Sequence, residues 1–506
     1  MLFIWRSLLL PLLRGAVLVL VCGMTLGRST PPSQNEDRGW TDGIGGELAV
    51  DDSSTFNVAT AIDALRGEAP QAAQGEAKGA QPFLLLGPSL DTWLGQPWTK
   101  RASTAFVPGK RDRNDPRPYA MAYQLRSEIY QSAQPQSKVI GYVRRGYGVP
   151  VLHQASGKGC EGGVWYRVEP MGFVCTKRGF VVSKDDYVDI TPLPSPDISK
   201  PLPYVYGHVR RSGTARFDKV PSPADEARVE LARAGAASWP SIADRTQSTD
   251  YYVAIRNPRR SGSPRYYQSF SGRYIRSSDI DVLGTPPMYG EELGSGTDLP
   301  LAFVYTEGAK VYCGRRAPLR VCGMADKHAR FQATRTVSVG GQQYVESTNG
   351  FLVPRSALRV AKKRERPRQI ASNARWLHID IAEQVLIAYE GSKAVYATLI
   401  SSGRQGYTTP PGLFRIREKL ITATMSGQDK SAGPYEVEEV PWVMFYHEGF
   451  AIHAAFWHND FGRTRSHGCT NLAPVDARWV YDFTSPKAPE GWYAIRTEGT
   501  WIWLTS

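Results

Sequence analysis

The sequence lacks the short motifs that bind nucleotides or the commoner catalytic metals. It has no Walker phosphate loop, no GxGxxG after a predicted strand, no HExxH pair and no CxxC pair. Charged residues make up only 22%, and the net charge of +13 comes without a Lys/Arg-rich nucleic-acid motif or RNA-binding signature. Nucleotide-driven chemistry and the usual zinc sites are therefore not expected. We predict no cofactor and no nucleic-acid partner.

Apolar residues are plentiful, at 42% of the 506 residues, and 11% are aromatic. Wholesale disorder is therefore excluded, because this composition supplies packed cores. The 48 glycines and 36 prolines favour short strands and turns over helical bundles. We predict a mainly β fold, with about three domains for a chain of this length.

The N-terminal segment is typical of an exported chain. Residues 1–27 combine Arg6 and Arg14 with an apolar run over 15–27, which indicates a signal peptide. The alternative is an uncleaved anchor, which would be the chain's one membrane contact. Residues 28–98 are acidic, poor in large apolar side chains and predicted to be a flexible linker. The predicted location is the periplasm or cell envelope.

Cysteine is scarce, with six residues, and Cys22 belongs to the targeting segment. In an oxidising compartment, cysteines that lie close together in one domain are expected to pair. Two disulfides are predicted, Cys160–Cys175 and Cys313–Cys322. Cys469 is left without a partner, and a lone thiol in that compartment is a liability unless it is used.

Two stretches resemble bacterial SH3-like modules, which often hold cell-wall peptides. Residues 119–185 alternate about five short strands with turns, a density typical of a small β-barrel. Residues 301–361 form a weaker copy, and both end in a strand that starts with Gly-Phe. Between them, 186–300 is rich in Pro, Arg and Tyr, with one predicted helix at 223–233. We interpret it as a connecting region.

From residue 370 to 506 the chain is again dense in predicted strands. Apolar runs at 376–381, 384–389 and 394–400 surround a turn at 390–393, and Thr409-Pro410-Pro411-Gly412 interrupts the sheet. A further hairpin is predicted at 442–453. This pattern predicts a β-sandwich or barrel-like domain.

The chemistry-bearing residues gather near the end of this domain. A thiol becomes a nucleophile as the thiolate, and a neighbouring imidazole can take its proton. His453 precedes Cys469 by sixteen residues, and His467 by two. Gly468 lets the backbone approach a substrate carbonyl, so that consecutive amides could form an oxyanion hole.

Three alternatives remain open at this point. His453, His458, His467 and Cys469 would supply a zinc site of three imidazoles and one thiolate, although their spacing matches no common zinc pattern. Cys469 could be a buried structural cysteine. His458 could replace His453 as the base, because spacing does not separate them.

The run Ser466-His467-Gly468-Cys469-Thr470-Asn471, with His453 before it, resembles the signature of the YkuD-type L,D-transpeptidase domain. Thr409-Pro410-Pro411-Gly412-Leu413-Phe414 resembles a second segment of that family. The resemblance implies Cys469 as nucleophile, His453 as base, and His467 with the Gly468 and Cys469 amides shaping the oxyanion site. The predicted substrate-binding residues are Ser466, Asn471, Trp457 and His458. Thr470 and Ala454 depart from the family's usual residues, but both stay small.

The family acts on peptidoglycan stem peptides, without metal or cofactor, and is sensitive to carbapenems. The resemblance implies a thioester on Cys469 after release of D-Ala, resolved by an amine of another stem or by an envelope protein. Resolution by water would make the chain an amidase or hydrolase. A third hypothesis is a non-catalytic wall-binding protein, which the intact His453, His467 and Cys469 set disfavours.

Overall fold

The computed structural model describes residues 117–183, 190, 192–245, 250–256, 265–294, 296–429 and 433–506. The predicted targeting segment and the predicted acidic linker lie outside these residues. Of the described residues, 46% lie in strands and 7% in helices, which confirms a mainly β fold for this part of the chain. Within the described ranges, no helix has the length and apolar character needed to cross a membrane.

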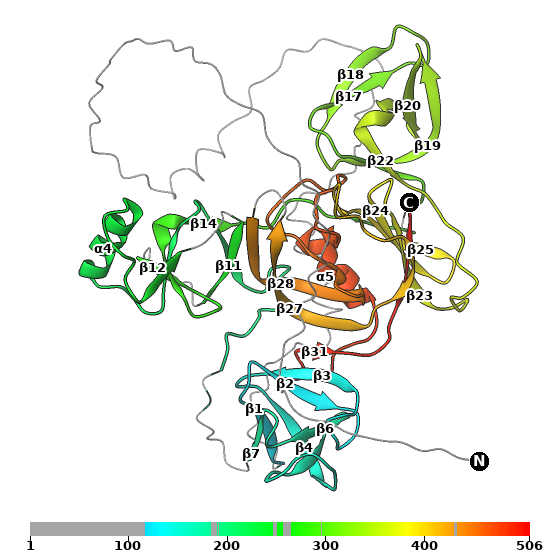
Figure 1. Cartoon of the computed structure of the whole chain (residues 1–506). Coiled ribbons are helices and arrows are strands. Elements are labelled where there is room, and N and C mark those ends of the chain that lie inside the picture. Colours follow the sequence, from blue (N-terminus) through cyan, green and yellow to red (C-terminus); the bar gives the residue numbers. More distant parts are fainter. Residues whose placement is uncertain are drawn as a thin grey trace, which may run out of the picture. The chain divides into compact units, whose positions relative to one another are not determined.

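Three stretches each contain seven strands joined by antiparallel pairings, which we name repeat 1, repeat 2 and repeat 3 (Figure 1). Repeat 1 contains β1 (Tyr119–Ala122), β2 (Arg126–Tyr130), β3 (Val139–Arg144), β4 (Gly148–Ala155), β5 (Trp165–Val168), β6 (Phe173–Cys175) and β7 (Phe180–Ser183). Repeat 2 contains β8 (Val205–Val209), β9 (Ala215–Phe217), β10 (Ala243–Arg245), β11 (Tyr251–Arg256), β12 (Tyr266–Ser269), β13 (Tyr274–Arg276) and β14 (Ile280–Leu283). Repeat 3 contains β16 (Leu301–Val304), β17 (Ala309–Cys313), β18 (Arg320–Ala325), β19 (Arg330–Val339), β20 (Gln342–Ser347), β21 (Leu352–Pro354) and β22 (Leu358–Ala361).

The three repeats share one strand order. In repeat 1 the pairings give β3-β2-β6-β5-β4-β1-β7. Repeat 2 has the corresponding order β10-β9-β13-β12-β11-β8-β14. Repeat 3 has β18-β17-β21-β20-β19-β16-β22. A common order across three segments indicates one architecture used three times in the chain.

The sheets are open at their ends. Among the described residues, no pairing joins β3 to β7, β10 to β14 or β18 to β22. The closed small barrels expected for repeats 1 and 3 are therefore not found, and their SH3-like character stays a prediction. Disulfides lie within both repeats, Cys160–Cys175 in repeat 1 and Cys313–Cys322 in repeat 3.

Repeat 2 differs from the connecting region expected between 186 and 300. Its strands are short and rich in Tyr, Arg and Ser, and its main apolar cluster is small, so the sequence pattern is weak. A helix, α4 (Pro223–Arg233), is inserted between β9 and β10 and matches the predicted bounds. Ser222 and Asp225 form a capping box at its start, which explains why this helix is readable from the sequence.

The C-terminal domain consists of two sheets and one helix. The first sheet has the order β15 (Glu291–Glu292), β25 (Lys393–Leu399), β24 (Val385–Glu390), β23 (Arg375–Asp380), β32 (Trp501–Thr505) and β26 (Gly412–Arg415). The second contains β27 (Glu418–Asp429), β28 (Gly433–His447), β29 (Phe450–Ala454), β30 (Thr470–Leu472) and β31 (Ala494–Ile495). Buried side chains of both sheets pack into one apolar cluster. The domain is therefore a two-layered sandwich.

Helix α5 (Pro474–Phe483) packs against β28 and β29 (Figure 1). Its Asp476 is fully buried and accepts hydrogen bonds from the Tyr396 hydroxyl at 2.6 Å, the Thr398 hydroxyl at 2.5 Å and the Gly290 N–H at 2.7 Å. Burial raises the pKa of Asp476 to about 6. One carboxylate thus fastens the helix to β25 and to the segment before β15.

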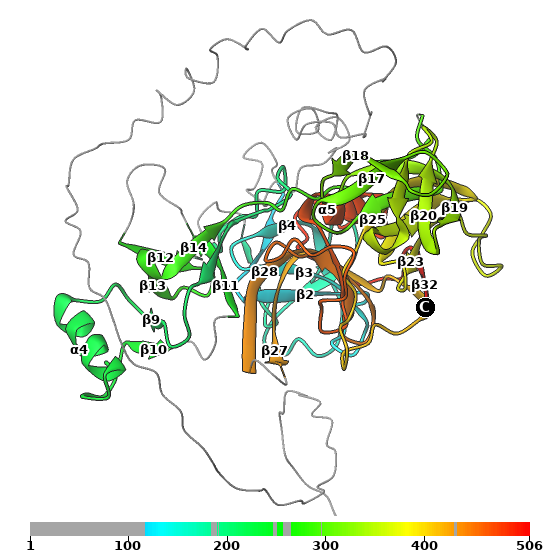
Figure 2. The ribbon, with the colours of Figure 1, turned by 90° about the horizontal axis from the view of Figure 1, so that it is seen from above.

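Repeat 2 is joined to the C-terminal domain by backbone pairing. Pairings of β3 with β31 and of β11 with β28 connect repeats 1 and 2 to the C-terminal domain in one larger sheet. Strand β11 runs parallel to β28, with Tyr251 opposite Glu436 and Tyr252 opposite Val437 (Figure 2). The buried Glu438 carboxylate accepts from the N–H groups of Ala254, Phe270 and Ser271, at 3.0 to 3.1 Å. Because a buried carboxylate is costly unless its oxygens are bonded, these contacts hold the two parts together.

Replacing Asp476 by Ala is expected to destabilise the C-terminal domain by at least about 3 kcal/mol, because three buried donors would lose their acceptor. Asp482→Ala, on the exposed side of the same helix, should cost about 1 kcal/mol or less. Thermal unfolding of the full chain measures both changes. Equal shifts in the two variants would contradict this role of Asp476.

Candidate active site

His453 lies on β29, which runs parallel to β30, the strand that follows Cys469. Strand β29 pairs with β30 so that Ile452 lies opposite Thr470 and His453 opposite Asn471. Cys469 directly precedes β30, and alternation places its side chain on the same face as Asn471 and His453. The pairing of the predicted nucleophile with the predicted base stays a prediction that this register supports.

Both groups are electrically neutral at rest. Burial raises the pKa of the half-buried Cys469 thiol, although the Ala451 N–H acts in the opposite direction. Burial lowers the pKa of His453 to about 4. Both shifts favour the uncharged forms, a thiol and a neutral imidazole.

The hydrogen bonds of the two histidines separate their roles. His453 Nδ1–H faces the Ala454 carbonyl at 3.1 Å, which leaves Nε2 as the basic nitrogen. Among the described residues, no hydrogen bond engages that Nε2. His458 instead accepts from the Asp460 N–H through Nδ1, and its Nε2 lies 3.0 Å from the side-chain amide of Asn471. The two histidines thus differ in their hydrogen-bond partners, and the role of His453 as base stays a prediction.

Three of the four predicted substrate-binding residues are buried and bonded inside the protein. His458, Ser466 and Asn471 are 7%, 6% and 2% exposed. Asn471 also exchanges backbone hydrogen bonds with Ser401, so both its side chain and its backbone are engaged. Their hydrogen bonds brace the site, and contact with a substrate stays a prediction for all four residues. Trp457 is half-buried and stacks on the His453 ring at 5.9 Å.

The turn that carries Cys469 is held by local hydrogen bonds. Gly468 has a φ of +116°, and a Cβ there would lie 2.7 Å from the Phe450 ring, so glycine is required. Its N–H donates to Ser466 Oγ at 3.0 Å, and the Ser466 hydroxyl in turn donates to the Cys469 carbonyl. The amide expected to serve the oxyanion site is thus engaged at rest.

Thr409 connects this turn to the Thr-Pro-Pro-Gly segment. Its hydroxyl donates to the Gly468 carbonyl at 2.7 Å and accepts from the Gly403 N–H at 2.8 Å. The residue is 1% exposed. The segment that the sequence singled out by resemblance therefore acts as a brace for the nucleophile's backbone.

His467 is fixed from three sides. Its ring stacks on Tyr435 at 4.6 Å and meets Tyr407 edge-on at 4.7 Å. Nε2–H donates to Asp429 at 2.5 Å, and Arg404 pairs with the same carboxylate. Burial and the Arg404 charge lower the pKa of His467. The side chain thus ties the nucleophile's turn to strand β27.

Repeat 3 holds the loop between His453 and Cys469. Arg359 donates to the Gly462 carbonyl at 2.7 Å, and Lys327 lies 3.8 Å from Asp460. The Arg463 guanidinium lies over the Tyr305 ring at 4.9 Å. The loop that carries His458 is therefore supported from outside the C-terminal domain.

The four side chains considered as zinc ligands each have a different hydrogen-bond partner. His458 faces Asn471, and His467 faces Asp429. In the part of the chain that the structure describes, no group of three or more His, Cys, Asp or Glu side chains is gathered as a metal site. The residues present therefore do not fit the zinc alternative.

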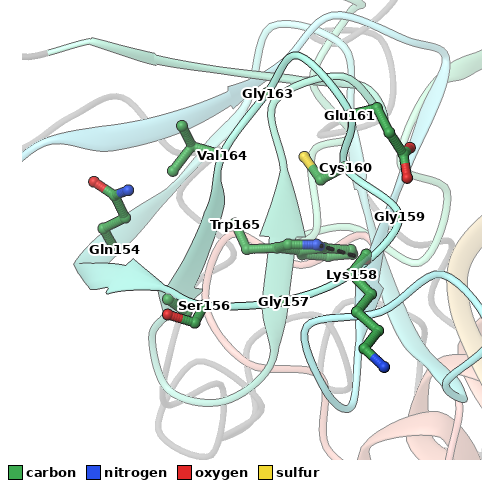
Figure 3. A pocket seen from close by; sticks show the side chains of 11 residues that line it. Gln154, Ser156, Gly157, Lys158, Gly159, Cys160, Glu161, Gly163, Val164 and Trp165 are labelled. Carbon is green, nitrogen blue, oxygen red and sulfur yellow. Dashed lines mark hydrogen bonds between the residues drawn. The ribbon is translucent and has the colours of Figure 1, made fainter.

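A separate hollow of about 680 Å³ lies in repeat 1 (Figure 3). It is lined by the loop between β4 and β5, from Gln154 to Trp165, and the Trp165 indole N–H donates to the Lys158 carbonyl at 3.0 Å. Its one cysteine, Cys160, is in a disulfide. It therefore holds no free thiol.

The sequence did not point to Arg404, Asp429, Tyr407 or Tyr435. Asp429 lies 38 positions and Arg404 63 positions from His467. No local spacing signals these contacts, because Arg404 and Tyr407 come from the segment between β25 and β26, Asp429 from β27 and Tyr435 from β28, and these meet only in the folded chain.

Thr409→Val should destabilise the nucleophile turn by about 1–3 kcal/mol, because the buried Gly468 carbonyl and Gly403 N–H would both lose their partner. Thermal unfolding measures the loss. Thr408→Val, at the preceding position, is the matched control. A Thr409→Val protein as stable as this control would contradict the bracing role.

Alkylation of Cys469 by iodoacetamide should accelerate about tenfold per pH unit between pH 7 and 9, because a thiol with a raised pKa has less than about 1% thiolate at pH 7. Mass spectrometry of the peptide that contains Cys469 gives the rate, with N-acetylcysteine as reference. A plateau below pH 7 would indicate a preformed thiolate–imidazolium pair and contradict the prediction.

Residues 374–498 match the YkuD family, described as the L,D-transpeptidase catalytic domain. The YciB protein of Bacillus subtilis (strain 168), named as a candidate L,D-transpeptidase, is 28% identical over 121 residues. The match covers 21% of this chain, and the chain spans 59% of the length of that relative.

Two solved structures show related likenesses. The catalytic domain of an E. faecium L,D-transpeptidase is 24% identical, with 26% of this chain and 98% of that chain covered and a TM-score of 0.22. An L,D-transpeptidase from Stackebrandtia nassauensis is 22% identical, with 29% and 59% covered and a TM-score of 0.20. On the family match, residues 374–498 of this chain are an L,D-transpeptidase catalytic domain of the YkuD family.

Proposed function

We propose that this chain is a peptidoglycan L,D-transpeptidase that uses Cys469 as its nucleophile and His453 as its base. The observation that supports the proposal is the β29–β30 register: His453 lies opposite Asn471, Cys469 comes two residues before Asn471, and the Ala454 carbonyl orients the imidazole. The neutral state of both groups fits general base catalysis, because a neutral imidazole can accept the thiol proton.

In the first half-reaction, His453 Nε2 takes the proton from Cys469 as the sulfur attacks the carbonyl between the L-centre of the stem's diamino acid and its terminal D-Ala. The tetrahedral intermediate then breaks its C–N bond. The imidazolium returns the proton to the leaving amine, so that D-Ala departs and a thioester remains. No electrons are exchanged with an outside group.

In the second half-reaction, an amine acceptor attacks the thioester and loses its proton to His453. The sulfur leaves and regains a proton, and the product is a 3→3 cross-link or an attached envelope protein. For either intermediate, the Gly468 N–H exchanges Ser466 Oγ for the substrate oxygen, and the Cys469 amide acts beside it. The acylating thiol would also react with carbapenems.

The proposed location is the periplasm or cell envelope. Two disulfides support it, because such bonds persist in oxidising compartments. We further propose that the repeats contact the wall, which would raise the local concentration of stem peptides.

Incubation of the full chain with tetrapeptide muropeptides should give 3→3 dimers and free D-Ala, measured by mass spectrometry. Cys469→Ala should give neither product, and His453→Gln should lower the rate by about 10²–10⁴ because general base catalysis is lost. His447→Gln is the matched control, since that partly exposed imidazole has no place in the mechanism.

The products distinguish the alternatives. Release of D-Ala without dimers, in the presence of acceptor stems, would replace transfer by hydrolysis. Absence of both D-Ala release and a carbapenem adduct on Cys469 would overturn the catalytic proposal and leave a wall-binding protein.

A further inference from the structure

Repeat 2 reaches the active site through strand β28. Tyr435, near the start of β28, stacks on His467, and the two residues that follow it pair with Tyr251 and Tyr252 of β11. Burial, and after it the charge of Cys469, raises the pKa of Tyr435. The start of β28 thus contacts both the turn that carries Cys469, through His467, and repeat 2.

A row of rings leads from repeat 2 to the base. Tyr252 stacks on His208 with 4.7 Å between ring centroids and lies 6.0 Å from Trp457. Trp457 in turn stacks on His453 at 5.9 Å. Aromatic pairs at these separations attract one another beyond the burial of their area.

A second contact supports the same region. Tyr206 of repeat 2 is fully buried, packs on Phe456 at 4.0 Å and donates its hydroxyl to the Glu439 carbonyl at 2.6 Å. Phe456 and Trp457 are adjacent in the chain and both contact Tyr252. The segment just after His453 is therefore packed against repeat 2 along two residues.

Charged groups place the Tyr252 hydroxyl near the loop that precedes Cys469. Burial and then Asp250 raise the pKa of Tyr252 to about 12, while the Arg465 guanidinium acts in the opposite direction. The phenol therefore stays uncharged and packs as a neutral ring at neutral pH.

We propose that Tyr252 is a positioning residue for the reaction: it holds Trp457 against the His453 ring, so that Nε2 stays directed at the Cys469 thiol. This inference rests on the proposed function for its catalytic part. Tyr252 lies outside the matched residues 374–498. Repeat 2 would thus complete the active site of this chain. The C-terminal domain without repeat 2 would lack the ring of Tyr252 that contacts Trp457.

The test uses three full-length variants and the muropeptide assay. Tyr252→Ala should lower kcat by about 10- to 100-fold with KM changed less than about threefold, because a base displaced by about 1 Å loses rate without losing substrate contacts. Tyr252→Phe keeps the ring and should recover most of the turnover. Tyr251→Ala, also half-buried on β11 but on its opposite face, should stay within about twofold of the parent. Thermal unfolding checks that both alanine variants remain folded.

A second readout does not require turnover. Loss of Tyr252 should let water reach His453, whose pKa would rise from about 4 towards its ordinary 6.5. No charged side chain contributes to the pKa of His453; burial and the Ala454 carbonyl set it, and the neutral His458 is its titratable neighbour. A higher imidazole pKa stabilises the thiolate, so iodoacetamide should alkylate Cys469 severalfold faster at pH 7 in Tyr252→Ala, and not in Tyr251→Ala.

The outcomes separate the two proposals. If the parent chain releases no D-Ala, the proposed function fails, and the alkylation comparison alone decides the role of Tyr252. Turnover and alkylation in Tyr252→Ala that both match Tyr251→Ala would overturn the inference. Equal losses in Tyr252→Phe and Tyr252→Ala would also overturn it, because the hydroxyl and not the ring would then matter.

Discussion

The parallel pairing of β29 with β30 is the constraint on which the rest of the site depends. Cys469 and His453 are sixteen positions apart in sequence, and the proposed proton transfer between them depends on this register, which sets Ile452 opposite Thr470. Because side chains alternate along a strand, a slip by one residue would turn the thiol to the opposite face. Much of the surrounding structure serves to prevent that slip: Asn471 is bonded to Ser401 and His458, and Thr409 holds the carbonyl of Gly468.

Buried polar contacts then connect the domain to its neighbours. Glu438 accepts three backbone N–H groups of repeat 2, and Glu439 forms a buried ion pair with Arg144 of repeat 1 at 2.5 Å. Such pairs add little net stability over apolar packing, but losing one partner leaves an uncompensated buried charge. They therefore fix how β28 meets the repeats, and β28 carries Tyr435 to the His467 ring.

The shared strand order shows that residues 119–361 contain three β repeats, and not two strand-rich modules with a connecting region between them. Repeats 1 and 3 were readable as dense, short strands, whereas repeat 2 was interpreted as a connecting region. The main apolar cluster of repeat 2 consists of Val209, Val253, Ile255, Ile275 and Ile280. Helix α4 is inserted between strands β9 and β10 of this repeat. So small a core leaves little alternation of apolar and polar residues to detect in the sequence. The pairing of β8 with β11 and β14 is seen only in the folded chain.

The sequence by itself determined the mainly β composition, the helix at 223–233, the C-terminal domain and the residues able to do thiol chemistry. These follow from local patterns: alternation, capping residues, and a cysteine set beside glycine and histidine. Only the tertiary structure decided that His458, Ser466 and Asn471 are buried and bonded inside the protein, that no hydrogen bond from the described residues engages His453 Nε2, and that Tyr252 of repeat 2 contacts Trp457. The physical reason is that a side chain's role depends on its hydrogen-bond and ring partners, and here those partners come from strands that are distant in sequence and meet only in the folded chain.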